Sequence, residues 1–419
     1  MKKIIVVGAG ASEMTAAVSY GRNIGRKNVL LLEKNDRILK KINATGNGKC
    51  NITNSNGREF TRVKSFLESL GLTIIPEDEG RMYPMSKRAE DVVSAFNREI
   101  KNLNIALHLN ENILSVVKKD GYFIVETNSN TYEGKKLVLA LGGKAGSRYG
   151  STGDGYGIAK QFGHEVKKQV PVLTGIECTQ DFSRLKGIRV QGDVSIFRKG
   201  QLLDKESGEI QFTEYGLSGI CIFNLSRHLL IDEGTAMADY EIVADMSQGM
   251  DIYEILSKKS CIPGVNKENI LLSIFPRALA KWLLLSSMMS EDDKFTEEDI
   301  KKLADTISSY RFNVKGARGW KMAQCTKGGV SLDELNLETM ESKIEEGLYF
   351  VGELIDYNDI SPARDRSGAQ RFPAGARPAP LRPGQRPPWE SSASRAVQPV
   401  PRNRGAAPRL PRRRGRRPS

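Results

Sequence analysis

Cysteine is scarce in this chain and is not arranged for disulfide or metal chemistry. Five cysteines occur among 419 residues, and no two of them form a C-x-x-C pair. They are Cys50, Cys178, Cys221, Cys261 and Cys325. An odd number of scattered cysteines argues against a disulfide framework and has no zinc-site spacing. We therefore expect no structural metal and no cysteine-stapled fold.

Histidine and long apolar runs are also lacking. The three histidines, His108, His164 and His228, share no metal-ligand spacing and are interpreted as structural. No window reaches the roughly 18 uninterrupted apolar residues of a membrane span. The first residues resemble the start of a signal peptide, but the glycines that begin at Gly8 interrupt the apolar stretch. The sequence predicts a cytoplasmic protein without a membrane partner.

Net charge is absent from most of the chain. The whole sequence carries +13, and residues 361–419 account for all of it, with fifteen arginines, no lysine and two acidic residues. The same segment holds twelve of the seventeen prolines. Such a composition cannot bury enough apolar surface to offset the entropy of ordering, so the segment is predicted to be disordered.

This basic tail has two interpretations. Arginine clusters bind phosphate without sequence preference, so the tail could be a nonspecific nucleic-acid arm. Alternatively, the change of composition after Ile360 is what translation in a wrong reading frame or a fused foreign segment would produce. The abruptness of the change favours the second interpretation. A nucleic-acid partner is therefore expected only nonspecifically, through the tail.

The first 34 residues read as strand, tight turn, helix and strand. An apolar run leads into Gly8-Ala-Gly-Ala-Ser-Glu13, and a second apolar run closes on Glu33. Gly8 permits the turn, and Gly10 lets the backbone approach a pyrophosphate that binds the free N–H groups of the helix N-terminus. Glu33 stands where such units hydrogen-bond an adenosine ribose. The pattern predicts a dinucleotide-binding unit.

Glu13 departs from this pattern. It occupies the third glycine position of G-x-G-x-x-G, where the helix normally packs against the strand. A long anionic side chain there costs packing and repels a diphosphate. We expect it to be tolerated if its carboxylate reaches solvent.

The following segments alternate between ligand-like loops and regular elements. Residues 43–54 are dense in small and amide side chains, which favours a polar ligand contact over a plain surface turn. Helical spacing covers 58–70 and 87–103. Short strands are predicted at 105–109, 113–117, 122–127 and 136–141. The last strand runs into Gly142-Gly143, and a helix is expected at 158–162.

The second half reads as an insertion followed by a return. Short β segments fill 170 to about 244, and residues 251–310 are helical by pattern. A strand at 347–351 then leads to a glycine-acid corner at Gly352-Glu353. One nucleotide fingerprint with such a distant return segment favours FAD in an extended groove over NAD in a simple dehydrogenase.

Several motifs together resemble one family, the BaiN-like bacterial flavoproteins, also labelled aminoacetone-oxidase-type FAD-binding proteins. The match covers Met1 to about Asp356. The motifs are Gly8-Ala-Gly-Ala-Ser, Thr45-Gly-Asn-Gly-Lys-Cys-Asn51, Ala140-Leu-Gly-Gly143 with Gly150-Ser-Thr-Gly-Asp-Gly155, Gly216-Leu-Ser-Gly219, Ala323-Gln-Cys-Thr-Lys-Gly-Gly-Val330, and Thr339-Met-Glu-Ser-Lys343 with Gly347-Leu-Tyr-Phe-Val-Gly-Glu353.

The resemblance implies an α/β fold, with a glutathione-reductase-like Rossmann FAD domain that is interrupted by a mainly-β domain and a helical domain. The predicted ranges are 1–169 for the first part of the FAD domain, 170–245 for the β domain, 246–312 for the helical domain, 313–360 for the return segment and 361–419 for the disordered tail. FAD contacts are implied at Gly8, Gly10, Ala11, Ser12, Glu33, Lys34, Asn47, Gly48, Lys49, Cys50, Asn51, Gly142, Gly143, Gly352 and Glu353.

The activity implied is that of an FAD-dependent oxidoreductase that reduces a small organic substrate, with NAD(P)H as a transient donor. One branch of the family is associated with unsaturated bile-acid intermediates, but no residue here carries that substrate over. No catalytic residue is identified, and Cys50 has no nearby partner for dithiol chemistry. Lys49 could place positive charge near reduced flavin or be an ordinary surface lysine. The alternatives are an amine oxidase that uses O2 and a nucleic-acid-binding protein.

The chain departs from the family pattern a second time after Asp356. The family continues there with a glycine-rich segment that begins its last FAD-contacting helix, whereas this chain has Tyr357-Asn-Asp-Ile360 and the basic tail. Together with Glu13, this change predicts weakened or absent FAD binding.

Overall fold

The computed structural model of the chain describes residues 2–24, 28–57, 60–229, 236–289 and 295–356. The predicted disordered tail and the end of the predicted return segment lie outside these residues. Within the described ranges, no helix is both long enough and apolar enough to cross a membrane.

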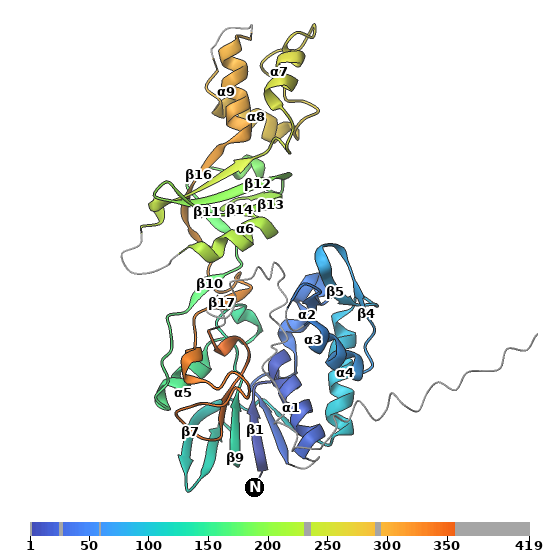
Figure 1. Cartoon of the computed structure of the whole chain (residues 1–419), viewed down its shortest axis with the longest axis vertical. Helices are drawn as coiled ribbons and strands as arrows, with labels where there is room; N and C mark the ends of the chain where they lie inside the picture. Colours follow the sequence, from blue (N-terminus) through green and yellow to red (C-terminus); the bar gives the residue numbers. More distant parts are fainter. Residues whose placement is uncertain (1, 25–27, 58–59, 230–235, 290–294, 357–419) are drawn as a thin grey trace, which may run out of the picture. The chain divides into compact units, whose positions relative to one another are not determined.

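A seven-stranded, mainly parallel sheet lies in the first part of the chain and is joined by the returning strand β18 (Figure 1). Its parallel strands are β6 (Ala106–Leu109), β2 (Val29–Glu33), β1 (Lys2–Val7), β9 (Thr131–Leu139) and β18 (Leu348–Phe350), with β18 beside β9. Two antiparallel strands, β8 (Tyr122–Thr127) and β7 (Ile113–Lys119), extend the sheet beyond β9. The continuous apolar runs of β1 and β2 suit strands that are buried on both faces.

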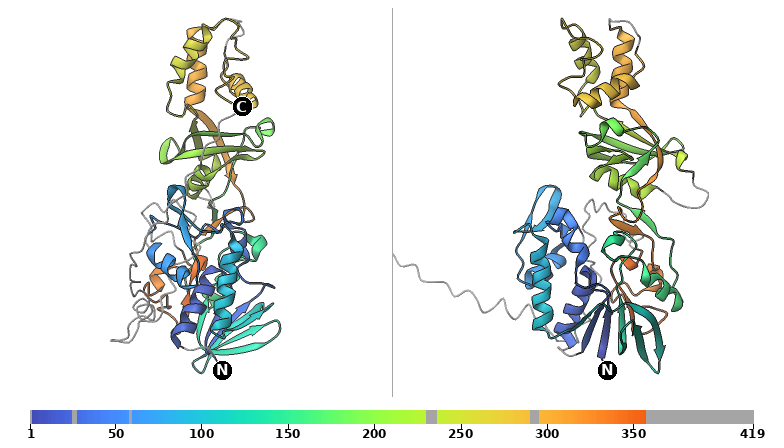
Figure 2. Two further views of the ribbon diagram at one scale, coloured as in Figure 1. Left: turned by 90° about the vertical axis from the view of Figure 1, so that its right-hand side faces the viewer. Right: turned by 180° about the vertical axis from the view of Figure 1, so that it is seen from behind.

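Helices α1 (Ala11–Ile24) and α4 (Ala89–Asn102) lie side by side in this part of the chain (Figures 1 and 2). Helix α4 buries Val92, Ala95, Phe96 and Ile100, which recur at helical spacing on one face. The shorter elements are α2 (Lys40–Asn43), α3 (Phe60–Ser69) and a small antiparallel sheet of β3 (Thr53–Asn54), β5 (Arg81–Pro84) and β4 (Ile74–Pro76).

A closed antiparallel barrel follows in the chain. Its strands, in order around the barrel, are β11 (Ile176–Cys178), β14 (Gly216–Ser218), β13 (Gln201–Thr213), β12 (Arg189–Arg198), β15 (Tyr240–Asp245) and β16 (Tyr310–Ala317). Helix α6 (Ile220–Leu225) packs on β13. Buried aromatic rings of Phe182, Phe212 and Phe312 fill the interior and contact Trp282. The sequence indicated short β segments here but not their closure into a barrel.

The helical segment is inserted between two barrel strands. Helices α7 (Ile252–Ser260), α8 (Arg277–Ser286) and α9 (Glu297–Ser308) connect β15 to β16. Strand β16 runs from Tyr310 to Ala317, so it crosses the predicted domain boundary at residue 312. Phe312 and Val314 on this strand are buried in the core that the barrel shares with the helices. Helix α8 begins only after Pro276, which cannot donate a backbone hydrogen bond, so the apolar run from Leu271 is not one helix.

Two short strands join the outgoing and returning chain. Strand β10 (Val170–Val172) pairs with β17 (Cys325–Lys327), so the segment before the barrel lies beside the segment after it. Helix α5 (Asp154–Gln161) begins four residues before the predicted start at residue 158. These segments lie next to the site described below.

Candidate functional site

A cavity of about 400 Å³ lies where the parallel strands of the sheet end. Its wall includes the glycine turn after β1, Glu33 at the end of β2, Gly142 after β9, and Gly352 after β18. The carboxyl ends of parallel strands are where open α/β sheets bind their ligands, and the volume is typical of small-molecule sites. The two ends of the described chain thus meet at one cavity.

Most of the predicted cofactor residues line this cavity. Nine of them do so: Gly8, Gly10, Ala11, Ser12, Glu33, Lys34, Gly142, Gly352 and Glu353. Five do not: Gly48, Lys49, Cys50, Asn51 and Gly143. The side chain of Asn47 lies outside the part of the chain that the structure describes. The contacts of all fifteen with FAD stay predictions.

The segment from Asn47 to Asn51 is held elsewhere by its own backbone. Residues Thr45–Gly48 form a 3-10 turn, and the N–H of Cys50 donates to the carbonyl of Thr45 at 3.0 Å. The N–H of Ile52 donates to the carbonyl of Met82 at 2.8 Å, which ties the segment to the small sheet. The Cys50 side chain is buried, and that of Lys49 is exposed.

Close backbone approach explains two of the glycines. Gly352 has φ +75°, and a Cβ added there would overlap Ser12 Oγ at the start of α1. A Cβ added at Gly143 would overlap Thr326 Oγ1. Both positions therefore need glycine, which positions the return segment against the first helix and against the loop after β9.

Glu33 braces the glycine turn from the end of β2. Its Oε2 accepts a hydrogen bond from the N–H of Ala9 at 2.7 Å. Its Oε1 accepts from the backbone N–H of Asn35 at 2.8 Å and from the side-chain amide of Asn35 at 2.5 Å. The predicted contact of Glu33 with a ribose would be added to these bonds.

Charged side chains join segments that are distant in sequence around the cavity. Lys34 Nζ contacts Thr152 Oγ1 at 2.6 Å and Asp154 Oδ2 at 2.5 Å. Lys41 Nζ contacts Glu353 Oε2 at 3.0 Å. Lys34 and Glu353 are thereby fixed in position, whichever ligand the cavity receives.

Thr326 connects Glu353 to the loop after β9 by hydrogen bonds. Its N–H donates to Glu353 Oε1 at 2.8 Å, and its Oγ1 accepts from the N–H groups of Lys144 and Ala145 at 2.9 and 3.0 Å. Thr326 lies in the glycine-rich motif that the sequence singled out, so its position could have been inferred. Lys41 carried no such signal, because its partner Glu353 is distant in the sequence.

The Glu13 carboxyl does not reach solvent, contrary to the expectation from sequence. Glu13 is 5% exposed and borders the cavity. A Cβ added at Gly8 would lie 2.8 Å from Glu13 Oε1, and one added at Gly10 would lie 3.0 Å from Oε2. Burial raises the pKa of Glu13 to about 8, with a further contribution from Glu33. The carboxyl fills the space beside the glycine turn.

Two buried acceptors near the amide-rich segment lack partners. Asn43 Oδ1 and Asn51 Oδ1 form no hydrogen bond within the described residues. A buried acceptor without a donor costs free energy. Neither Asn43 nor Asn51 lines the main cavity, so these two oxygens give no evidence about its ligand.

The parallel sheet, its glycine turn and its cavity define a flavoprotein with a Rossmann FAD-binding domain. The chain belongs to the HI0933-like family: the family model described as HI0933-like protein Rossmann domain matches residues 58–361. Its resemblance to the BaiN-like flavoproteins is confirmed. The chain is an FAD-dependent oxidoreductase.

Curated bacterial relatives align over most of their length. The chain is 30% identical over 388 residues to the 3-dehydro-bile acid delta(4,6)-reductase of Clostridium scindens, covering 86% of this chain and 94% of the relative. It is 26% identical over 383 residues to the ribosomal RNA dihydrouridine synthase of Escherichia coli, covering 84% of this chain and 91% of the relative.

Solved structures show a weaker likeness. A flavocytochrome c3 fumarate reductase in an open conformation matches with TM-score 0.43 and 15% identity, over 90% of this chain and 75% of that one. The 3-ketosteroid-delta4-(5alpha)-dehydrogenase of Rhodococcus jostii RHA1 matches with TM-score 0.41 and 13% identity, over 90% and 95%. Scores at this level carry no argument about chemistry.

The residues present fit FAD with one exception. The glycine turn and the start of α1 both line the cavity and suit a diphosphate, and Glu33 lines it at the end of β2 where a ribose is expected. The exception is Glu13, whose carboxyl lies beside the turn where the diphosphate of a dinucleotide binds.

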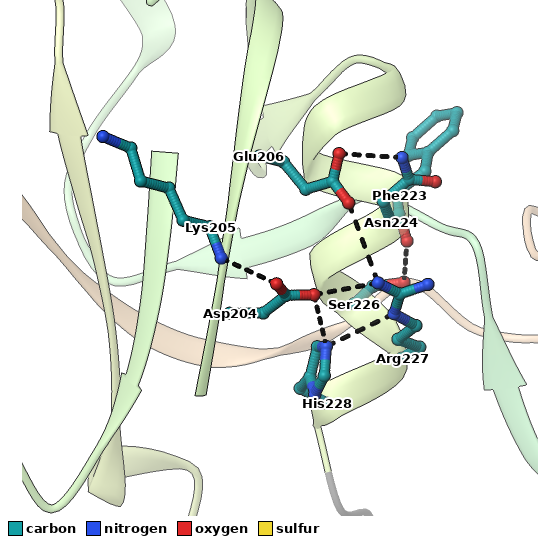
Figure 3. A network of polar contacts seen from close by, with 8 residues as sticks. All are labelled: Asp204, Lys205, Glu206, Phe223, Asn224, Ser226, Arg227 and His228. Carbon is teal, nitrogen blue, oxygen red and sulfur yellow. Dashed lines mark hydrogen bonds and ion pairs between the residues drawn. The ribbon is translucent and has the colours of Figure 1, made fainter. Parts of the chain in front are cut away.

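A second polar cluster lies on the barrel (Figure 3). Asp204 Oδ2 on β13 pairs with Arg227 at 2.8 Å and with His228 Nε2 at 2.9 Å. Arg227 also reaches Glu206 Oε1 at 3.7 Å, and Asn224 donates to Glu206 Oε2 at 3.3 Å. The cluster fastens the end of α6 and the turn after it to β13.

Asp204→Asn is expected to lower the free energy of unfolding by about 1–2 kcal/mol at pH 7, because Arg227 and His228 lose their anionic partner. Burial alone would raise the pKa of Asp204, but hydrogen bonds from Arg227, Lys205 N–H and His228 outweigh it and lower the pKa. The stabilisation is therefore present above the unfolded pKa of 3.8 and is lost as pH falls through the lower folded pKa.

Urea unfolding of both proteins at pH 7 and pH 3 measures this effect. The separation between the two curves should be smaller at pH 3 than at pH 7, because the stabilisation begins to fall below pH 3.8. Asp120→Asn, in the exposed hairpin between β7 and β8, is the matched control and should leave the curve unchanged. An equal separation at both pH values would show that the Asp204 charge contributes nothing.

Proposed function

We propose that this flavoprotein takes a hydride from NAD(P)H and delivers it to an electron-poor carbon–carbon double bond of a small organic molecule. Bound FAD would supply the hydride chemistry, and the protein supplies binding, orientation and electrostatics. The residues around the main cavity hold the cofactor, and a separate neighbouring cavity receives the donor.

The second cavity is the observation that carries this proposal. It has a volume of about 570 Å³ and shares Ser151 with the main cavity. Three cations and one indole line it: Lys144, Arg318, Lys321 and Trp320. Cations bind phosphate groups, and an aromatic face receives a flat ring. This combination suits a nicotinamide dinucleotide that visits the flavin.

The side chains of this cavity are already partly ordered. Lys144 Nζ lies 5.9 Å from the ring centres of both Tyr156 and Trp320. Arg318 pairs with Glu177 at 3.2 Å and lies over the ring of Tyr215, while its buried Nε has no partner within the described residues. These contacts hold the Arg318 guanidinium at the cavity wall, where its positive charge can attract a phosphate group.

The names of the relatives support the substrate class. A delta(4,6)-reductase and a dihydrouridine synthase are both named for the saturation of a carbon–carbon double bond, one in a steroid and one in a uracil ring. In both cases a carbonyl group can withdraw electrons from that bond. The shared chemistry, rather than either substrate, is what we propose for this chain.

Anaerobic mixing of the FAD-loaded protein with NADH and NADPH tests the proposal. The flavin absorbance near 450 nm should bleach with at least one of them and return when an enone is added. Reduction by an amine instead, with reoxidation by air and no requirement for NAD(P)H, would favour the amine-oxidase alternative. Nucleic-acid binding that survives removal of residues 361–419 would contradict the nonspecific role given to the tail.

Charge reversal in the second cavity gives a further prediction. Lys321→Glu is expected to raise the KM for the nicotinamide donor about tenfold, because a cation that binds phosphate becomes an anion; tenfold corresponds to about 1.4 kcal/mol. The rate at saturating donor should change little. Steady-state kinetics measure both values. Lys281→Glu, exposed on α8, is the control and should leave the KM unchanged. If the two variants raise the KM equally, the nicotinamide donor does not bind in this cavity.

A further inference from the structure

Glu13 lies among the donors that a bound diphosphate uses. It is the third residue of α1, which begins at Ala11. The N–H of Met14 already donates to the carbonyl of Gly10 at 3.1 Å, so the unpaired donors of the helix start come before it. The backbone N–H of Glu13 and the hydroxyl of Ser12 face the Glu13 carboxyl and favour its ionised form, so they lower its pKa, although burial outweighs them. The side chain therefore engages part of the anion-binding end of the helix.

The surrounding backbone encloses this carboxyl. Gly8 and Gly10 lie against its two oxygens, and a Cβ added at Gly8 would also lie 2.9 Å from the carbonyl oxygen of Ala140. Gly352 packs against Ser12 and closes the neighbouring side. Glu13 is 5% exposed and its remaining open side borders the main cavity. A diphosphate on the glycine turn would meet the carboxyl where it lies.

The charges that face Glu13 have opposite effects: Glu33 disfavours an ionised Glu13 and Lys41 favours it, but burial has the largest effect and raises the pKa. Glu33 on β2 adds negative charge, and Lys41 on α2 is already paired with Glu353 on the return segment at 3.0 Å. Adding a diphosphate would bring further negative charge into the same buried space. An ionised Glu13 and a bound diphosphate are therefore mutually repulsive in a region where water screens little.

We propose that Glu13 is a dinucleotide-binding residue of this chain and that it acts as a neutral carboxylic acid, so that FAD binds only the form in which Glu13 is protonated. The protonated oxygen donates its O–H to a phosphate oxygen, and the other oxygen keeps the hydrogen bond from the helix N-terminus. No proton is transferred; the complex retains the one that Glu13 already carries.

A defined pH dependence follows from this assignment. Burial raises the pKa of Glu13 to about 8, so most molecules are competent at pH 7. Above pH 8 each further pH unit lowers the fraction of molecules with a protonated Glu13 about tenfold, and the apparent affinity for FAD falls with it. Below it the affinity should be flat. Glutamine is neutral at every pH and of similar size, so Glu13→Gln should remove the dependence.

The test is FAD binding to the full chain after removal of its flavin, followed by flavin fluorescence from pH 6.5 to 9.5. The Kd of the unmodified chain should rise about tenfold per unit above pH 8. Glu13→Gln should give a flat profile, and Glu13→Gly should be flat and at least tenfold tighter at pH 7, because the crowding side chain is gone. Glu298→Gln, exposed on α9, should follow the unmodified chain.

The titration of FAD itself affects all variants alike and cancels in their comparison. If Glu13→Gln keeps the pH profile of the unmodified chain, Glu13 is not the titrating group and the proposal fails. It also fails if affinity rises with pH, since that would mean that an ionised carboxylate leaves the site, or if none of the proteins binds FAD. Circular dichroism confirms folding, and Glu13→Gln carries the test should Glu13→Gly not fold.

Discussion

Gly352→Ala is expected to abolish FAD retention and to lower the free energy of unfolding by about 3 kcal/mol. The new Cβ would overlap Ser12 Oγ at the start of α1, and its backbone has φ +75°, which disfavours any residue with a Cβ. The return segment and α1 would have to separate. Both line the cavity, so the cofactor site would open at its diphosphate end.

Two further variants separate strain from overlap. Gly121→Ala in the β7–β8 hairpin has a similar φ of +78° with nothing within 4 Å of the added Cβ, so it should cost only about 1 kcal/mol. Combining Gly352→Ala with Ser12→Ala removes the overlapping oxygen and should recover much of the lost stability. Urea unfolding and the flavin content of the purified proteins are the measurements. A Gly352→Ala protein with normal flavin content would contradict the close approach.

The sequence was informative where structure depends on neighbours in the chain. The run before Gly8, the turn and the acid at Glu33 have a local spacing that permits few arrangements, and the structure places them at one cavity. The glycine-acid corner at Gly352 could be predicted for the same reason: a strand followed by glycine and an acid marks a sheet end. The positive φ of Gly8 and Gly352 strongly favours glycine at both positions.

Contacts between distant segments could not be read in this way. The pairing of Lys41 with Glu353 depends on how the return segment folds back, and no local pattern contains that information. Closure of the barrel is similar, because β16 joins β11 and β15 only after the helical insertion. The segment from Asn47 to Asn51 was predicted to contact FAD from the family resemblance. Gly48, Lys49, Cys50 and Asn51 do not line the cavity, and the next residue, Ile52, pairs with Met82 of the small sheet.

Glu13 shows how a single residue can depart from a pattern without destroying the fold. Its chemistry predicted either solvent exposure or a loss of packing, and the structure has neither. The carboxyl folds back into space that the side-chain-free Gly8 and Gly10 leave open. Burial then favours the neutral form, which removes most of the electrostatic penalty at neutral pH. The cost appears only when the group is forced to ionise.

The flavin-free chain is therefore expected to lose stability as pH rises, and Glu13→Gln should not share this loss. Glu13 has a pKa of about 8 when folded and 4.5 when unfolded. The folded state binds its proton more tightly, so the stabilisation is complete below pH 4.5 and declines until pH passes about 8. The full difference between these limits is up to roughly 5 kcal/mol.

Urea unfolding at pH 5, 7 and 9 measures this difference as the gap between the unmodified chain and Glu13→Gln. Other groups titrate in both proteins and cancel, so the gap should move in favour of Glu13→Gln with each step in pH. A constant gap would mean that the carboxyl ionises in the folded state as easily as in water, which its burial beside Gly8 and Gly10 does not allow. Glu13 would then not be a neutral acid beside the glycine turn, and the proposal that FAD binds only the protonated form would fail.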